Sequence, residues 1–270
     1  MQPVSFSLTR RQVLARGGAA SLGLWLNSIG LLHAQTRPAT LLLMAGAGYK
    51  RPVEALCAAF TQASGVTVER SYGNLQQLFA QAKASGGVDV LVGDANFIDK
   101  AQDLHLPLRI KLGQGILTLA WRRNLEVANG AVGLAAMRAL LAVPGHAVAL
   151  PNPQQAIYGN AAKELLLAQG VWGNLQDRIT VVGTVPQVSA YLTAGEVDLG
   201  FMNLTEALAV KDQLGGFITL PSGAGSYTEV SIVAAMSEAS KTPLALASVQ
   251  QFALFLETSV AHDILRRAGL

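Results

Sequence analysis

The sequence predicts a two-lobed α/β protein in which the chain crosses twice between the lobes. Strand-like and helix-like segments alternate through most of the chain after residue 39. Two long extended runs, 108–122 and 227–236, interrupt this alternation. Alternating strands and helices are typical of parallel sheets with right-handed crossovers. We therefore expect two α/β units, with the extended runs as the connections between them.

The first lobe is predicted from three strand–helix pairs and the end of the chain, over residues 38–118 plus 225–270. Apolar or alternating runs predict strands at 40–45, 66–71 and 88–92. Helical periodicity predicts helices at 51–64, 74–84, 96–104 and from 243 to the end. Gly65 stands where a glycine ends a helix in the left-handed conformation.

The second lobe is predicted to span residues 119–224. Its expected strands are 147–150, 179–183 and 197–202. Its expected helices are 132–141, 158–169, 188–194 and 206–213. The chain would leave the first lobe near Leu119 and return to it near Gly225.

Composition excludes several classes of protein. The charged fraction of 14% and the apolar fraction of 51% rule out a disordered chain. The aromatic fraction of 6% is low for a platform that stacks nucleic-acid bases. Three of the 20 basic residues lie in the first 34 positions, which contain no acid, so the rest of the chain has 17 basic and 17 acidic residues. We expect no nucleic-acid partner.

The first 34 residues have the pattern of an export signal. A positive start is followed by a moderately apolar stretch from Gly17 to Leu32 and by the small residue Ala34. Arg10 and Arg11 resemble the twin-arginine signal that exports folded proteins in bacteria. A periplasmic location follows from this interpretation. A retained anchor, or an amphipathic first helix of the domain, are the alternatives.

Motifs for metal binding and catalysis are missing from the sequence. Cys57 is the one cysteine, the four histidines are scattered, and no nucleotide-binding or nucleophile motif occurs. Asp89 and Asp94 flank a predicted strand, where acids usually serve as turn and cap residues. We expect no metal site, no cofactor and no enzymatic activity.

The loops after the strands are the predicted ligand site. In open α/β sheets, ligands bind in the crevice at the carboxyl ends of the strands. Five such loops lead into predicted helices, at 45–50, 71–75, 152–159, 183–186 and 203–206. Helix N-termini offer free amide N–H groups and a positive dipole end, so together they could hold an anion. Ordinary tight turns remain the alternative.

Several segments, in order, resemble the periplasmic molybdate-binding protein family, the capture component of an ABC importer. The resemblance runs from about Thr40 to Leu220, with a weaker tail to the C-terminus. Its most distinctive pieces are 55–68, 87–95, 151–153, 158–164 and 194–200. The resemblance implies a two-lobed fold like that of periplasmic binding proteins, and the capture of a small oxyanion without any chemical reaction.

The resemblance also implies which residues contact the ligand. The family often has a serine on each of the first two loops, and these positions are Gly48 and Asn74 here. In the second lobe the contacting positions are Tyr158, Val185 through its N–H, and Asn203, where the family often has tyrosine. Backbone N–H groups at Gly48 and Tyr158, and the amide groups of Asn74 and Asn203, can still donate hydrogen bonds.

The sequence therefore predicts a monomeric solute-binding protein for molybdate or tungstate, with a membrane permease as its partner. Because the family's hydroxyl groups are replaced, another anion or a small organic solute is the first alternative. A periplasmic sensory or accessory protein of the same fold is the second alternative, since fold does not fix function. Lys50 and Arg51 either add positive charge beside the first loop or are solvated residues at a helix start.

Overall fold

The computed structural model describes residues 40–101, 103–127, 130, 132–238 and 243–270. The predicted export signal, residues 1–34, lies outside these residues. Within them, no helix combines the length and apolarity needed to cross a membrane. The chain divides into the units Met1–Thr36 and Arg37–Leu270, and the fold described below belongs to the second unit.

The first sheet has five strands in the order β2-β1-β3-β10-β4. The strands are β1 (Thr40–Gly46), β2 (Thr67–Gly73), β3 (Val90–Asp94), β4 (Leu108–Gly115) and β10 (Val230–Met236). Strand β1 pairs in parallel with β2 and β3, and β10 is antiparallel to both of its neighbours. The sheet therefore combines four strands from the first part of the chain with one that returns from much later.

The second sheet repeats this arrangement, in the order β7-β6-β8-β5-β9. Its strands are β5 (Leu117–Arg122), β6 (Val148–Pro151), β7 (Ile179–Val182), β8 (Leu199–Asn203) and β9 (Leu214–Thr219). Strand β6 is parallel to β7 and β8, whereas β5 is antiparallel to β8 and β9. We call the two halves built on these sheets lobe one and lobe two.

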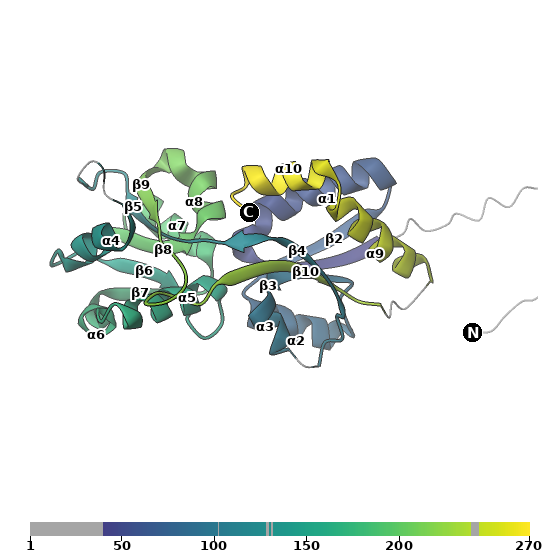
Figure 1. Ribbon diagram of the computed structural model, residues 1–270, viewed down its shortest axis with the longest axis horizontal. Helices are drawn as coiled ribbons and strands as arrows, with labels where there is room; N and C mark the ends of the chain where they lie inside the picture. The colour runs from purple at the N-terminus through teal and green to yellow at the C-terminus, as the bar shows by residue number, and fades with distance from the viewer. Residues whose placement is uncertain (1–39, 102, 128–129, 131, 239–242) are drawn as a thin grey trace, which may run out of the picture. The chain divides into compact units, whose positions relative to one another are not determined.

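Helices cover the sheets, as Figure 1 shows. Lobe one has α1 (Lys50–Ser64), α2 (Leu75–Ser85), α3 (Ala95–Asp99), α9 (Pro243–Leu256) and α10 (Ser259–Arg267). Lobe two has α4 (Gly133–Ala142), α5 (Ile157–Ala168), α6 (Trp172–Leu175), α7 (Val185–Ala194) and α8 (Leu204–Val210). Three 3₁₀ turns complete the list, η1 (Ala47–Tyr49), η2 (Gln176–Arg178) and η3 (Lys211–Gln213). In Figure 1, α1, α9 and α10 lie on one side of the first sheet and α2 and α3 on the other.

The predicted fold class is confirmed, because the chain crosses between the two sheets twice. The first crossing is at Ile116, between β4 and β5, and the second joins β9 to β10. Tyr227 fastens the two crossings together. Its hydroxyl accepts a hydrogen bond from Leu117 N and donates to Leu220 O, both at 3.0 Å.

The strand β9 was not predicted, and two glycines explain why. Gly215 and Gly216 interrupt the apolar pattern, although both pack against the Trp121 ring on the neighbouring strand. A Cβ atom at Gly216 would lie 2.4 Å from Trp121 Cζ2. The two glycines are therefore required for close packing against Trp121. They also break the apolar pattern by which the sequence would have predicted this strand.

Several predicted helices have different bounds in the structure. The helix predicted at 96–104 is α3, which ends at Asp99, and the one predicted at 188–194 is α7, which begins at Val185. The helix predicted at 206–213 is α8 followed by η3. The final helical region is two helices, because the Thr258 side chain caps α10 by accepting from Ala261 N. The Thr258 cap therefore marks the start of a separate helix, α10.

Candidate functional site

A small cavity lies where loops of the two lobes meet. Its volume is about 30 Å³, roughly two to three times the room that one water molecule needs. Its walls come from four loops, with lining residues Gly46, Ala47, Gly48, Tyr49, Gly73, Asn74, Leu75, Ala156, Ile157, Tyr158, Thr184 and Val185. Such a space suits a ligand with few heavy atoms.

Three α-helices begin at this cavity. They are α2, α5 and α7, and each has at least ten residues. The turn η1, which leads directly into α1, also lies in the wall. The first amide groups of a helix have no partner within the helix, and the helix dipole is positive at this end. The cavity therefore collects donors and partial positive charge from both lobes.

Sequence explains why the helices begin at these residues. The Asn74 side chain accepts from Gln77 N at 2.9 Å and so caps α2. Thr184 and Gln187 form a reciprocal capping box at the start of α7, with Thr184 N donating to Gln187 Oε1 at 3.0 Å. Caps of this kind hold the end of a helix in place. The free amides are thus fixed around the cavity.

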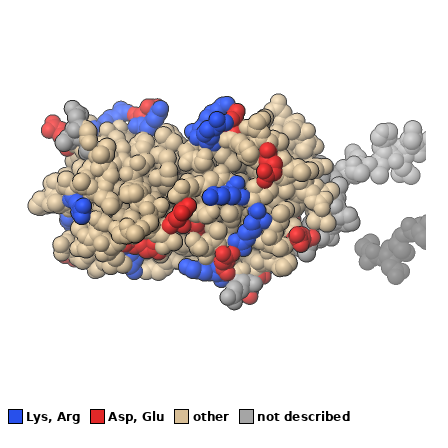
Figure 2. Space-filling model, viewed as in Figure 1, with Lys and Arg blue, Asp and Glu red and all other residues tan. Residues whose placement is uncertain are grey.

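No charged side chain lines the cavity among the described residues. Lys50 lies over the Tyr72 ring, 5.7 Å from its centroid. Arg51 reaches across to lobe two, where Arg51 Nη1 is 3.7 Å from Glu206 Oε2. Figure 2 shows acidic and basic residues interspersed on the displayed face, with large uncharged areas between them. An anion in the cavity would therefore be held by neutral donors.

Four of the five residues predicted to contact the ligand line the cavity. These are Gly48, Asn74, Tyr158 and Val185. The fifth, Asn203, is buried beside them but is not part of the lining. Its side-chain oxygen caps α8, at 3.3 Å from Glu206 N, and its Nδ2 donates to Gly48 O at 3.0 Å.

Both asparagines reach from one lobe to the other. The donor from Asn203 on lobe two goes to Gly48 on lobe one. Asn74 on lobe one places its Nδ2 at 3.4 Å from Gln155 Oε1 on lobe two, the longest of these contacts. In each of the two asparagines, the side-chain oxygen caps a helix and the side-chain nitrogen contacts the other lobe across the cleft between the lobes.

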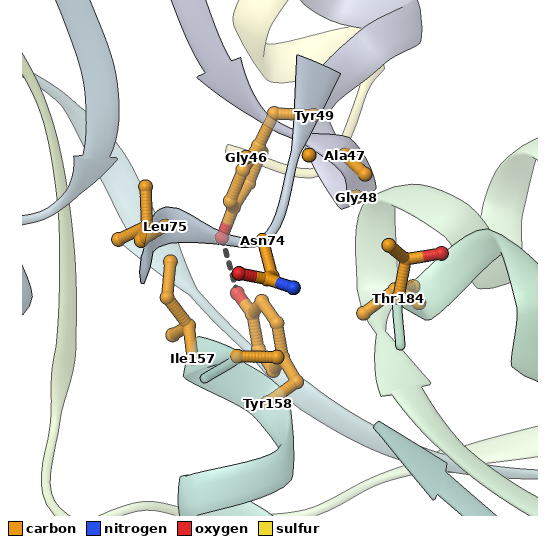
Figure 3. A pocket seen from close by; sticks show the side chains of 12 residues that line it. Gly46, Ala47, Gly48, Tyr49, Asn74, Leu75, Ile157, Tyr158 and Thr184 are labelled. Atoms are coloured by element: carbon orange, nitrogen blue, oxygen red, sulfur yellow. Dashed lines mark hydrogen bonds between the residues drawn. The ribbon is translucent and has the colours of Figure 1, made fainter. Parts of the chain in front are cut away.

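Sequence reasoning missed two polar residues of the lining, Thr184 and Tyr49. The hydroxyl of Tyr49 is hydrogen-bonded to that of Tyr158, and Figure 3 shows this pair beside Asn74. The ring centroids are 6.2 Å apart. Burial raises the pKa of both phenols above the ordinary value near 10. The signal available in sequence was the position of Tyr49, at the end of the loop after the first strand.

The other polar candidates have structural roles. Asp89 Oδ2 accepts from Leu42 N at 2.8 Å, and Asp94 caps α3 and accepts from Ser231 N at 3.0 Å. The predicted role as a cap residue is confirmed for Asp94, whereas Asp89 instead binds the backbone of β1, 47 positions earlier in the chain. Cys57 is buried in the core, as expected of an apolar thiol. No cluster of three or more potential metal-ligating side chains occurs in the described part of the chain.

Two lobes joined by two crossings, with a small cavity where their loops meet, define a solute-binding architecture. The family of bacterial extracellular solute-binding proteins matches residues 41–270 of the chain. The chain belongs to this family of solute-binding proteins. The proteins of this family and the similar structures below are binding proteins, in agreement with the expectation of no enzymatic activity.

Individual proteins resemble the chain at moderate identity. The periplasmic molybdate-binding protein of Azotobacter vinelandii is 25% identical, with a TM-score of 0.71 over 85% of this chain and 97% of that one. The sulfate-binding protein SubI of Mycobacterium tuberculosis has 17% identity and a TM-score of 0.64, with 86% of each chain covered, which shows the fold alone. A "putative binding protein" of Haemophilus influenzae is 26% identical over 75% of this chain and 80% of its own length.

Proposed function

We propose that the chain captures a small, fully deprotonated tetrahedral oxyanion, molybdate or tungstate first, and delivers it to the permease of an ABC importer. The observation that carries this proposal is the cavity at which α2, α5 and α7 begin without any charged lining side chain. Neutral amide and hydroxyl donors bind anions well when they are fixed in place and shielded from water. The likeness to the Azotobacter protein supports the choice of ligand.

The size of the cavity favours an inorganic ion over an organic solute. At about 30 Å³ it holds a few heavy atoms in the closed arrangement. Its walls are backbone, apolar side chains, two phenols, the Asn74 amide and the Thr184 side chain, which leaves little room for a carbon skeleton. Binding and closure of the lobes are the whole function in this proposal, without a chemical step or a cofactor.

The lining side chains favour an anion without a proton. The oxygen of Asn74 accepts from Gln77 N, and the Thr184 side chain accepts from the backbone of Gln187. These acceptors are therefore already used by helix caps. Phosphate near neutral pH carries a proton that needs an acceptor, whereas molybdate, tungstate and sulfate do not. We expect phosphate to bind more weakly than any of these three.

A thermal-shift screen of residues 37–270 tests the proposal. Molybdate, tungstate, sulfate, phosphate and acetate are added separately, and titration calorimetry follows for each ion that raises the melting temperature. A ligand at one hundred times its dissociation constant stabilises the folded state by about 2.7 kcal/mol. We expect molybdate and tungstate to give the largest shifts. The absence of a shift with every anion would contradict the proposal, and a stable protein partner without a ligand effect would favour an accessory role.

A further inference from the structure

We propose that Tyr49 is a positioning residue of the binding site, whose hydroxyl holds Tyr158 at the cavity when the lobes are closed. This inference rests on the proposed function, in which Tyr158 contacts the ligand. Nothing in the resemblance to molybdate-binding proteins assigns a role to Tyr49.

The two phenols come from opposite lobes. Tyr49 ends η1, after the first strand of lobe one, and Tyr158 is in the first turn of α5 in lobe two. The hydroxyl groups are hydrogen-bonded to each other, and the residues are 1% and 2% exposed. Because each lobe contributes one partner, the bond exists only when the lobes meet. Opening the cleft would expose both hydroxyls to water.

The chain leaves room for this pair at the first crossing between the lobes. A Cβ atom at Gly115, the last residue of β4, would lie 2.2 Å from the Tyr158 hydroxyl oxygen and 3.0 Å from that of Tyr49. Gly115 does not have the positive φ that favours glycine. A glycine is therefore needed here because a side chain would clash with the two phenols, and not because of the backbone conformation. The two phenol hydroxyls therefore lie directly against Gly115, next to the first crossing between the lobes.

The other polar groups near the pair have partners of their own, except that the Asn203 side chain also hydrogen-bonds the Tyr49 hydroxyl. Tyr227 uses its hydroxyl to join the two crossings. Asp94 accepts from Phe97 N and Ser231 N. Loss of the Tyr49 hydroxyl therefore removes the hydrogen-bond partner of buried Tyr158, whereas loss of the Tyr158 hydroxyl leaves Tyr49 with Asn203.

The pair predicts an unusual order among variants. Tyr49→Phe leaves the buried Tyr158 hydroxyl without its partner, whereas the double change removes both hydroxyls and keeps the ring shapes. Unsatisfied buried groups are costly, and replacement of both partners is close to neutral. Tyr49→Phe should weaken ligand binding about 5- to 100-fold, and Tyr158→Phe should weaken it less, because Asn203 still serves the Tyr49 hydroxyl. The double variant should bind no more weakly than the weaker single variant.

The experiment combines affinity with a direct measure of closure. Spin labels at Gln76→Cys on α2 and Ala190→Cys on α7, both exposed, report the distance between the lobes while Cys57 stays buried. Molybdate affinity and release rate are measured for wild type, both single variants and the double variant. Tyr191→Phe is the matched control, because Tyr191 is 39% exposed on α7. A purely structural role would lower the melting temperature without changing the distances or the release rate.

We expect each single variant to lengthen the distances in ligand-free protein and to release molybdate faster, and the control to match wild type. The inference would be overturned if the distance between the spin labels were unchanged in both single variants. It would also be overturned if the loss of molybdate affinity in the double variant equalled the product of the two single-variant losses. The proposed function alone would be overturned if the wild-type protein bound no oxyanion while the single variants still showed longer distances between the spin labels. Wild type that binds molybdate, with affinity and distances unaffected by the Phe variants, would overturn the role of Tyr49 alone.

Discussion

The side-chain amide of Asn203 donates a hydrogen bond to the carbonyl oxygen of Gly48, 3.0 Å away and in the other lobe. The two residues are 155 positions apart in the chain. The resemblance to molybdate-binding proteins implies a serine at the first position and a tyrosine at the second. In this chain Gly48 leaves space that the Asn203 side chain fills. A hydrogen bond between the two lobes therefore replaces the two hydroxyl groups that the resemblance implies.

Gly48→Ala should weaken ligand binding about tenfold and leave the fold intact. A Cβ atom at this position would lie 3.2 Å from both terminal atoms of Asn203 and 3.3 Å from Val185 Cβ. All three belong to lobe two, so the added methyl group opposes closure rather than folding of lobe one. Overpacking of this kind costs roughly 1–3 kcal/mol. Calorimetry with the best ligand and thermal melting of the free protein measure the two effects.

The control for this change is Gly173→Ala, since a Cβ atom there meets nothing within 4 Å. The control should bind as wild type does. Equal affinities for Gly48→Ala and wild type would show that the lobes close without the contact between Gly48 and Asn203.

Ligand binding should be insensitive to pH between 7 and 9 and should weaken from about pH 10 upward. Burial raises the pKa of Tyr49 and Tyr158 in the closed protein, whereas exposed phenols ionise near 10. The stabilisation that requires neutral phenols is complete below pH 10, and it is lost as the pH rises from there towards the raised pKa values. The other titratable groups facing the pair are Asp94 and Tyr227, and burial raises the pKa of both.

Titrations with molybdate at pH 7 to 11 test this dependence, with the variant lacking both hydroxyls for comparison. That variant should show a smaller loss of affinity above pH 10. Identical profiles for the two proteins would show that the alkaline loss does not come from the phenol pair.

The order of strands and helices could be predicted because each depends on neighbouring residues. Periodicity located β1 and α1 within one residue at either end, and Asn203 followed by Glu206 is a local signature of a helix start. The contacts that close the cleft join residues far apart, as in Tyr49 and Tyr158, which are separated by 109 positions. A single sequence contains no pattern that pairs two such tyrosines. The nitrogen of Asn203 was predicted as a donor to the ligand, and its contact with Gly48 depends on how the lobes meet.

Replacement of Arg10 and Arg11 by lysine should leave the unprocessed chain in the cytoplasm, if the twin-arginine interpretation of residues 1–34 is correct. The twin-arginine route depends on the arginine pair, whereas the general secretory route accepts lysine in the same charged region. Fractionation of cells followed by immunoblotting measures this. Normal processing of the lysine variant would assign the protein to the general route.

Asn74→Asp should reduce ligand affinity at least a hundredfold and change stability little. The carboxylate keeps the shape of the side chain and can still accept from Gln77 N, so α2 keeps its cap. The lost group is the Nδ2 donor, 3.4 Å from Gln155 Oε1 at the cavity. In its place, a negative charge would face the anion. Two unit charges 4 Å apart repel by about 4 kcal/mol at an effective dielectric constant near 20.

The matched control is Asn174→Asp, which introduces the same charge on α6 at an exposed position. Calorimetry and thermal melting of both variants separate loss of binding from loss of stability. If Asn74→Asp binds its best ligand within a few-fold of wild type, Asn74 does not contact the ligand. The correspondence with the serine of molybdate-binding proteins would then be wrong at this position, and the donors of the site would be the backbone amides at the starts of α2, α5 and α7.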